Sequence, residues 1–390
     1  MPSSSERATL RTIINDYFGT IPDPRVERTR AHQLVDIITI ALLAVLSGAD
    51  GWNAIETYGL AKQEWLETFL ELPNGIPSHD TFARVFARLD PALLESKFQD
   101  WVMLIAPELE ASIIAIDGKC LKGSYDRENG VQALRLVSAW ASSHQLVLGQ
   151  CSVHDKSNEI TAIPLLLEQL DVQGSIVTID AMGTQTTIAQ QIIQSQADYI
   201  LALKRNQPSL ADAAQKYFDE HKAQSTLDSA QVRKETTCEA GHHRIETRTL
   251  WQVPAEQVFS ESQLNTWAGL ATLVVVESVR RLWNKETHEI RFFISSLAVD
   301  SQTFAQYIRS HWGIENQLHW CLDVTFSEDQ SRIRKDHAPR NISLLRRLSL
   351  NLLRQETSNL SLKMKRYKAA MDNQFLLKVL TDAGIISTVF

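Results

Sequence analysis

Residues 112–117 read SIIAID and residues 175–180 read SIVTID, so two short apolar runs each end in an aspartate, Asp117 and Asp180. Short runs of apolar and β-branched residues predict buried strands. Neighbouring parallel strands would bring the two carboxylates to the same edge of a sheet. A third acidic residue, Glu315, lies in residues 304–320 (FAQYIRSHWGIENQLHW), where the apolar spacing predicts a helix.

The segments around these runs predict the order of the elements in the sheet. Strand patterns occur at residues 112–117, 133–142, 145–155, 175–180 and 198–204, and helical patterns at 160–170 and 186–196. The resulting order, βββαβαβ, predicts a mixed α/β sheet of the ribonuclease-H-like kind, in which the strands that end in Asp117 and Asp180 are neighbours.

The rest of the chain divides by texture. We expect an N-terminal all-α domain that could bind DNA ends, a ribonuclease-H-like catalytic domain interrupted by a β-rich insertion, and a helical tail. The N-terminal domain is residues 1–108, and the tail is residues 356–390. The two parts of the catalytic domain are residues 109–210 and 301–355, and the insertion between them is residues 211–300. Within the first region, Ser78 is a plausible N-cap and Asp90-Pro91 opens another helix. This pattern fits a plain helical hairpin better than a helix-turn-helix.

Composition indicates a globular protein in a reducing cytoplasm. The four cysteines are far apart and form no CxxC pair, and the apolar run at 37–46 is too short to span a membrane. The net charge of -7 is unusual for a DNA-binding protein. Residues 321–370, however, carry eleven Lys and Arg against five Asp and Glu, a net +6 that suits either a DNA-binding patch or a solvated helical face.

Three carboxylates from two strands and a helix suggest metal-dependent chemistry. Hard oxygen ligands suit a pair of Mg²⁺ ions, which can clamp the attacking and leaving oxygens of a phosphodiester displacement. Alone, each aspartate could equally be a cap or turn residue. His311 and His319, four residues on either side of Glu315, raise zinc as a rival, but HExxH spacing is absent. Phosphate-binding P-loops and serine nucleophile elbows are also absent from the sequence.

Polar and basic residues near the three carboxylates are candidate DNA contacts. Lys119 and Lys122 follow Asp117, and Lys204 closes the strand at 198–204. The loop at 154–159 (HDKSNE) could reach DNA or only solvate a turn, with Ser157 or Asn158 capping the next helix.

Several motifs in a fixed order give the chain a family resemblance. The chain resembles bacterial insertion-sequence DDE transposases, in particular the H-repeat-associated subgroup, with a β-strand insertion between the second Asp and the Glu. The motifs are DPRVERTRAHQLVDIITIALLAVLSGADGW (23–52), AIDGKCLKGS (115–124), HDKSNEITAIP (154–164), TIDAMGTQ (178–185), YILALKRNQ (199–207), HWGIENQLHWCLDVTFSEDQSRIR (311–334) and HAPRNISLLRR (337–347).

The resemblance implies that Asp117, Asp180 and Glu315 are the catalytic triad and hold two Mg²⁺ ions, with Mn²⁺ as a substitute. It implies double-stranded DNA as partner, namely terminal inverted repeats and target DNA, and a homodimer in the synaptic complex. Where the wider class carries Tyr, Arg and Lys around the Glu, this chain has Ile308, His311 and Leu322.

DNA contacts near the Glu therefore fall to neighbouring residues. The candidates are Tyr307, Arg309, His311, His319, Arg334 and Arg340. The acidic residues Asp323, Glu328 and Asp329 are alternative third ligands. We thus expect a transposase that cuts and joins DNA at the ends of its element. The alternatives are a catalytically silent DNA-binding protein derived from such an element and a stand-alone nuclease.

Overall fold

The N-terminal helices form where the sequence predicts them. The computed structural model describes residues 11–12, 14–105, 112–126, 130–153, 158–224, 232–241, 244–299 and 303–382. After the short turn η1 (Glu27–Thr29) come α2 (Leu34–Leu46), α3 (Trp52–Ala61), α4 (Gln63–Leu66), α5 (His79–Arg88) and α6 (Pro91–Ile105). Nearly every residue of α2 is buried, as its continuous apolar run requires. Among the described residues, no helix is both long enough and apolar enough to cross a membrane.

The helical hairpin predicted around residue 90 is present. Ser78 occupies the N-cap of α5, but its hydroxyl contacts the Thr81 hydroxyl and makes no cap bond to the backbone. Asp90 does cap α6, because its Oδ1 accepts the Ala92 N–H at 3.0 Å. α5 packs against α3 and against α13 (Ala338–Gln355), so one of its faces is committed to the core.

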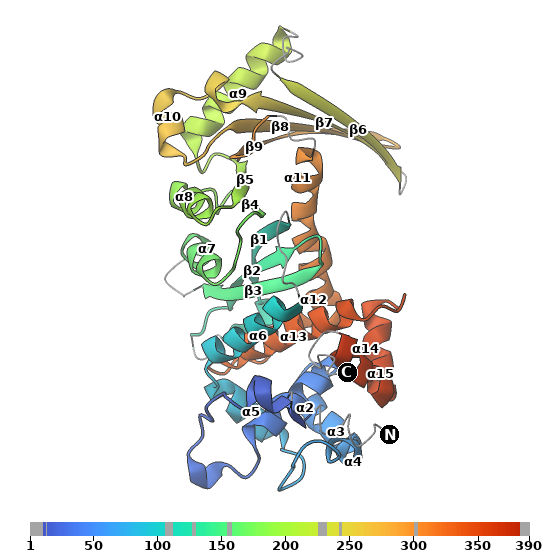
Figure 1. The fold of residues 1–390 in the computed structure, drawn as a ribbon. Helices are drawn as coiled ribbons and strands as arrows, with labels where there is room; N and C mark the ends of the chain where they lie inside the picture. The colour runs from blue at the N-terminus through green and yellow to red at the C-terminus, as the bar shows by residue number, and fades with distance from the viewer. Residues whose placement is uncertain are drawn as a thin grey trace.

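The C-terminal helices complete this helical region. α13 also packs on α2 and α6, and α14 (Leu362–Met371) and α15 (Asn373–Asp382) close around it. In Figure 1 the blue N-terminal and red C-terminal helices accordingly lie together at one end of the molecule.

A nine-stranded sheet carries the ribonuclease-H-like order predicted from the sequence. Its strand order is β3-β2-β1-β4-β5-β9-β8-β7-β6. The first five strands are β1 (Ile113–Cys120), β2 (Arg135–Ala141), β3 (Leu146–Val153), β4 (Ile176–Ile179) and β5 (Asp198–Leu203). β1 and β2 pair in antiparallel fashion, as do β2 and β3, whereas β1, β4 and β5 are parallel. The turn η2 (Lys122–Ser124) follows β1.

The β-rich insertion continues this sheet instead of forming a separate one. It contains α9 (Pro208–Ala223), β6 (Arg233–Gly241), β7 (Arg244–Pro254), η3 (Ala255–Gln257), α10 (Glu261–Thr266), β8 (Thr272–Leu282) and β9 (Lys285–Ser295). β9 pairs antiparallel with β5, with Ile294 opposite Leu201. The β-rich character of this insertion was predicted from the sequence, but α9 and β6 were not. β6 is mostly exposed, so it lacks the apolar run that predicts a strand.

Helices cover both faces of the catalytic strands. α7 (Glu159–Glu168) and α8 (Thr186–Gln194) lie on one face, and α11 (Phe304–Gly313) runs along the other (Figure 1). The single helix expected around Glu315 is divided into α11, a π-helical segment η4 (Ile314–His319) and α12 (Trp320–Thr325). The short turn η5 (Glu328–Gln330) then leads to α13.

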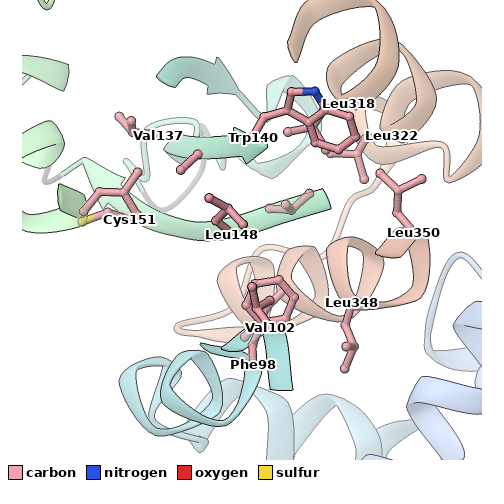
Figure 2. Close-up of a cluster of buried hydrophobic side chains, with 14 of the residues drawn as sticks. Phe98, Val102, Val137, Trp140, Leu148, Cys151, Leu318, Leu322, Leu348 and Leu350 are labelled. Carbon is pink, nitrogen blue, oxygen red and sulfur yellow. The ribbon is translucent and has the colours of Figure 1, made fainter. Parts of the chain in front are cut away.

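One apolar cluster joins the sheet to the helical region. Trp140 on β2 is fully buried, and Figure 2 shows it beside Leu318 and Leu322 of η4 and α12. Phe98 of α6 and Leu348 of α13 fill the space below the strands in the same view. This packing fixes the helix that carries Glu315 on the catalytic sheet.

Candidate active site

The strand register brings Asp117 and Asp180 to neighbouring positions. Ile116 of β1 is the partner of Ile179 of β4 in the parallel pair, and each aspartate is the next residue along its chain. Asp180 is held locally, because its Oδ1 accepts the N–H groups of Met182 and Gly183 at 3.0 and 3.3 Å. The expectation that the two strands are neighbours is therefore confirmed, but Asp117 does not end its strand, because β1 continues along β2 to Cys120.

Glu315 approaches the same point from the helix on the opposite side. It is exposed and lies within the π-helical segment η4, which packs against β1. The Trp320 N–H bonds to the Glu315 carbonyl, which is the i to i+5 pattern of a π-helix. Single π turns of this kind recur at functional sites, where the extra residue changes the direction of nearby side chains.

Electrostatics link the three carboxylates to a fourth. Burial raises the pKa of Asp117 to about 7, and the charges of Asp180, Glu159 and Glu315 add to the rise. The pKa of Glu159 is also raised, first by burial and then by Asp180. Like charges therefore gather here without enough cationic compensation, a pattern frequent at functional sites.

Sequence reasoning gave Glu159 only a possible DNA contact. It is the first residue of α7, whose N-cap Asn158 accepts the Ile160 N–H at 3.1 Å, as the capping expectation required. A Cβ on Gly118 would lie 2.2 Å from the Glu159 carboxylate carbon, so this carboxylate rests against β1 at Gly118, the residue after Asp117. Its position at a helix start directly after a strand was the signal available in the sequence. His154, Lys156 and Ser157 of the same loop lie outside the described residues.

Two histidines on the α11–η4 helix contact the strands that carry the aspartates. His311 Nδ1 lies 2.9 Å from Thr178 Oγ1 on β4, and burial lowers the His311 pKa. His319 Nδ1 lies 3.5 Å from Asp117 Oδ2. Burial, then the charges of Arg347 and Lys119, lower the His319 pKa to about 3, so this ring is neutral at neutral pH. The two rings face different strands, which does not favour the zinc alternative.

Two protein-family models match this chain. The model described as "Transposase DDE domain" matches residues 108–352, and the model described as "DDE_Tnp_1-associated" matches residues 15–102. The chain belongs to the DDE transposase family. The first match contains Asp117, Asp180 and Glu315, and the second spans helices α2 to α6. The sequence-based resemblance is thus confirmed, and the chain is a transposase.

Curated relatives are similar in sequence to this transposase over almost its whole length. The candidate transposase YncI of Escherichia coli O157:H7 is 39% identical over 95% of this chain and 94% of its own. The candidate H-repeat-associated transposase YhhI of E. coli K12 is 37% identical over 95% and 98%, respectively. Among solved structures, a piggyBac transposase synaptic complex with hairpin DNA matches with a TM-score of 0.40 and 11% identity, covering 96% of this chain and 79% of that one.

The carboxylates of Asp117, Asp180 and Glu315 are the kind of group that binds divalent cations. Carboxylate oxygens are the hard ligands that Mg²⁺ and Mn²⁺ prefer, and a cation would offset the burial and the neighbouring negative charges that raise the Asp117 pKa. Among the described residues, no three His, Cys, Asp or Glu side chains are already placed to hold one ion. A single ion bound by these carboxylates would need them closer together than they lie here.

Some of the basic residues predicted to contact DNA are exposed, and others form ion pairs or hydrogen bonds within the protein. Lys204 and Lys122 are exposed, and Lys122 pairs with Asp329 at 3.0 Å. Lys122 also lines an open hollow of about 590 Å³ beside the end of β1. Arg309 is exposed on α11 and pairs with Glu239 of β6. These side chains are available at the surface, as a DNA contact requires.

Other predicted contacts are engaged inside the protein. Lys119 is 7% exposed and its Nζ lies 2.5 Å from Asp323 Oδ1 and 3.0 Å from Glu328 Oε2. Arg340 is bonded to Glu95 at 2.8 and 2.5 Å. Arg334 donates to the Gly123 carbonyl at 3.2 Å and stacks over Tyr125.

Much of the positive charge of residues 321–370 also faces inward. The side chains of Arg346, Arg347, Lys365 and Arg366 are buried. The net charge of that segment is therefore a poor measure of its surface charge.

Proposed function

We propose that this transposase cleaves DNA at the terminal inverted repeats of an insertion sequence and joins the freed 3′ ends to target DNA. Asp117, Asp180 and Glu315 would be its catalytic residues and metal ligands. The observation that carries the proposal is the register of β1 and β4, which sets two carboxylates side by side, with Glu315 close enough to raise the pKa of Asp117.

Each acidic side chain has a distinct task in this proposal. Asp117 and Asp180 would hold the two ions from neighbouring positions of the sheet, and Glu315 would complete one ion's ligands from η4. Bound Mg²⁺ or Mn²⁺ ions would supply Lewis acidity and lower the pKa of an attacking water or hydroxyl. His319 would orient the Asp117 carboxylate, and Asp180 would be oriented by the two N–H groups that it accepts.

Double-stranded DNA would approach the edge at which β1 and β4 end. Lys204 follows β5, the strand next to β4, and Arg309 lies on α11, so both flank the carboxylates. Exposed cations at these positions suit phosphate contacts, which position a duplex without reading its sequence. Synapsis of two element ends would require a homodimer, in keeping with the resemblance drawn from the motifs.

The test uses labelled DNA that carries the element's own ends, with Mg²⁺ or Mn²⁺. We expect cleavage and strand transfer by the wild type, loss of both in Asp117→Asn, and unchanged binding to the DNA ends. Asp212→Asn, an isosteric change at an exposed site on α9, is the matched control and should remain active.

Each other outcome selects a different function. Binding without cutting by both the wild type and Asp117→Asn would favour a catalytically silent DNA-binding protein. Cutting without joining would favour a stand-alone nuclease. Cleavage retained in Asp117→Asn would refute the assignment of the triad.

A further inference from the structure

Four charged side chains form a buried ion cluster beside the carboxylates: Lys119, Asp323, Glu328 and Arg347. Lys119 Nζ contacts Asp323 at 2.5 Å and Glu328 Oε2 at 3.0 Å. Glu328 Oε1 accepts a bond from Arg347 at 2.9 Å and one from the Ser343 hydroxyl at 2.7 Å. The side chains of Glu328 and Arg347 are fully buried. Two positive and two negative charges are therefore paired, and of the four side chains only Asp323 is partly exposed.

The cluster joins β1 to three segments that follow Glu315 in the chain. Lys119 lies on β1, Asp323 on α12, Glu328 in η5 and Arg347 on α13. Arg347 Nε also reaches Ser138 Oγ on β2 at 3.4 Å. A displacement of any one of these elements would leave a buried charge without its partner, which is strongly unfavourable.

Lys119 ties the strand of Asp117 to the segment of Glu315. It follows Asp117 by two residues, so both side chains leave the same face of β1. Its Nζ also lies 3.4 Å from the carbonyl oxygen of His319, the last residue of the π-helical segment η4. One side chain therefore sets the distance between the strand that carries Asp117 and the end of the segment that carries Glu315.

Stability alone does not account for such a cluster. Buried ion pairs contribute little compared with well-packed apolar residues of similar volume, because desolvation offsets their attraction. They do impose direction, since each charge accepts only a partner in a narrow geometry. Directional contacts around metal ligands are what orient those ligands and tune the affinity for the metal.

We propose that Lys119 and Glu328 are positioning residues of the transposase, which hold η4 on β1 so that Glu315 and Asp117 can bind the same metal centre. This inference rests on the proposed function for its metal site. It gives Lys119 a role inside the protein in place of the DNA contact predicted from the sequence.

The test measures Mn²⁺ binding directly, by electron paramagnetic resonance of free Mn²⁺ titrated with the full-length protein without DNA. We expect Glu328→Gln to weaken Mn²⁺ binding by about tenfold, the range seen when partners of metal ligands are removed. Binding to DNA ends without metal should stay within about twofold of the wild type, because the cluster is internal and does not face the duplex.

Glu356 provides a matched control. Its side chain is also fully buried and bridges two cations, Lys365 at 3.2 Å and Lys378 at 3.0 Å, but these residues lie on α14 and α15. Glu356→Gln should lower the melting temperature as Glu328→Gln does, while leaving Mn²⁺ binding unchanged. Equal Mn²⁺ affinities in the two variants would refute the proposal and reduce the cluster to a structural role.

A milder variant keeps the test decisive if Glu328→Gln does not fold. Asp323→Asn removes one contact of Lys119 at a partly exposed site and leaves the pair of Glu328 and Arg347 intact. It should weaken Mn²⁺ binding by a few-fold, and wild-type affinity would overturn the proposal. Because binding is measured without cleavage, a wild type that binds Mn²⁺ but does not cut DNA would fail the proposed function and not this inference.

Discussion

Strand β1 carries two charged regions that differ in how their charges are compensated. Around Asp117, four carboxylates approach one another, and the pKa of Asp117 rises to about 7. Around Lys119, two residues further along, every charge of the buried ion cluster has an opposite charge within about 3 Å. Although burial opposes ionisation of Glu328, the charges of Arg347 and Lys119 lower its pKa below the ordinary value.

The difference separates function from support. Uncompensated charge is costly, and a protein retains it where a ligand supplies the missing charge. Compensated charge fixes geometry and needs no ligand. Substitutions in the two regions should therefore have opposite effects on the metal-free fold, and the following predictions test that contrast.

The largest effect is expected from Asp180→Asn. Loss of a ligand should reduce cleavage by more than about a hundredfold, since removing even a partner of a ligand costs roughly 10–100-fold. The metal-free protein should fold as well as the wild type, because Asp180 makes no ion pair with the residues that the structure describes, and an asparagine oxygen can still accept its two N–H bonds. Single-turnover cleavage and thermal unfolding in chelator measure the two quantities. Reduced thermal stability without metal would place Asp180 with the structural charges.

Arg347→Met should produce the reverse pattern in stability. It removes the fully buried cation that pairs with Glu328 Oε1, and breaking a buried pair costs about 3–5 kcal/mol. Urea unfolding of the metal-free protein measures the loss. Arg309→Met serves as the control, because its ion pair with Glu239 is exposed and should contribute little. A loss no larger than that of the control would mean that the cluster is not compensated as we describe.

The sequence predicted the first region well and the second hardly at all. Asp117 and Asp180 each follow an apolar run that predicts a strand. The order of the predicted elements makes these two strands neighbours, so the proximity of the two aspartates could be inferred from local sequence patterns. Glu328 and Arg347 are 19 residues apart and meet Lys119 only after α12, η5 and α13 fold back onto β1. Long-range pairing of this kind leaves no periodic signal. From the sequence alone, the basic residues of this segment therefore looked like part of a basic surface patch.

The π-helical turn at Glu315 also could not be predicted from the spacing of apolar residues. Residues 304–320 show apolar spacing that fits an ordinary helix, and one extra residue per turn barely disturbs that spacing. The insertion strand β6 was missed for a different reason, since none of its residues is buried and its pattern is polar. Where an apolar run is continuous and buried on all sides, as in α2 and β4, sequence and structure agree.

Asp117→Asn should stabilise the metal-free protein at neutral and higher pH. The folded-state pKa of about 7 lies above the ordinary 3.8, so folding takes up a proton between these values and stability falls as pH rises through this window. The asparagine variant escapes that loss. We expect a gain on the order of 1–3 kcal/mol at pH 8 and little gain near pH 4.

Urea unfolding in chelator at the two pH values measures this difference. Asp212→Asn, on the exposed face of α9, should show no such pH-dependent gain. Equal stability of Asp117→Asn and wild type at pH 8 would mean that the carboxylates around Asp117 do not repel one another in solution.

The smallest expected effect comes from Gly118→Ala, which tests whether Glu159 belongs to the uncompensated region. The new Cβ would lie 2.2 Å from the Glu159 carboxylate carbon, so that flexible side chain has to turn away, at a cost of about 1 kcal/mol. Moving the Glu159 charge should lower the pKa of Asp117, because this charge is one of those that raise it. Carbon-13 NMR of labelled aspartate measures the titration. Gly241→Ala, where nothing lies within 4 Å of the added Cβ, should leave the Asp117 pKa unchanged. An unchanged pKa in Gly118→Ala would limit the uncompensated region to Asp117, Asp180 and Glu315.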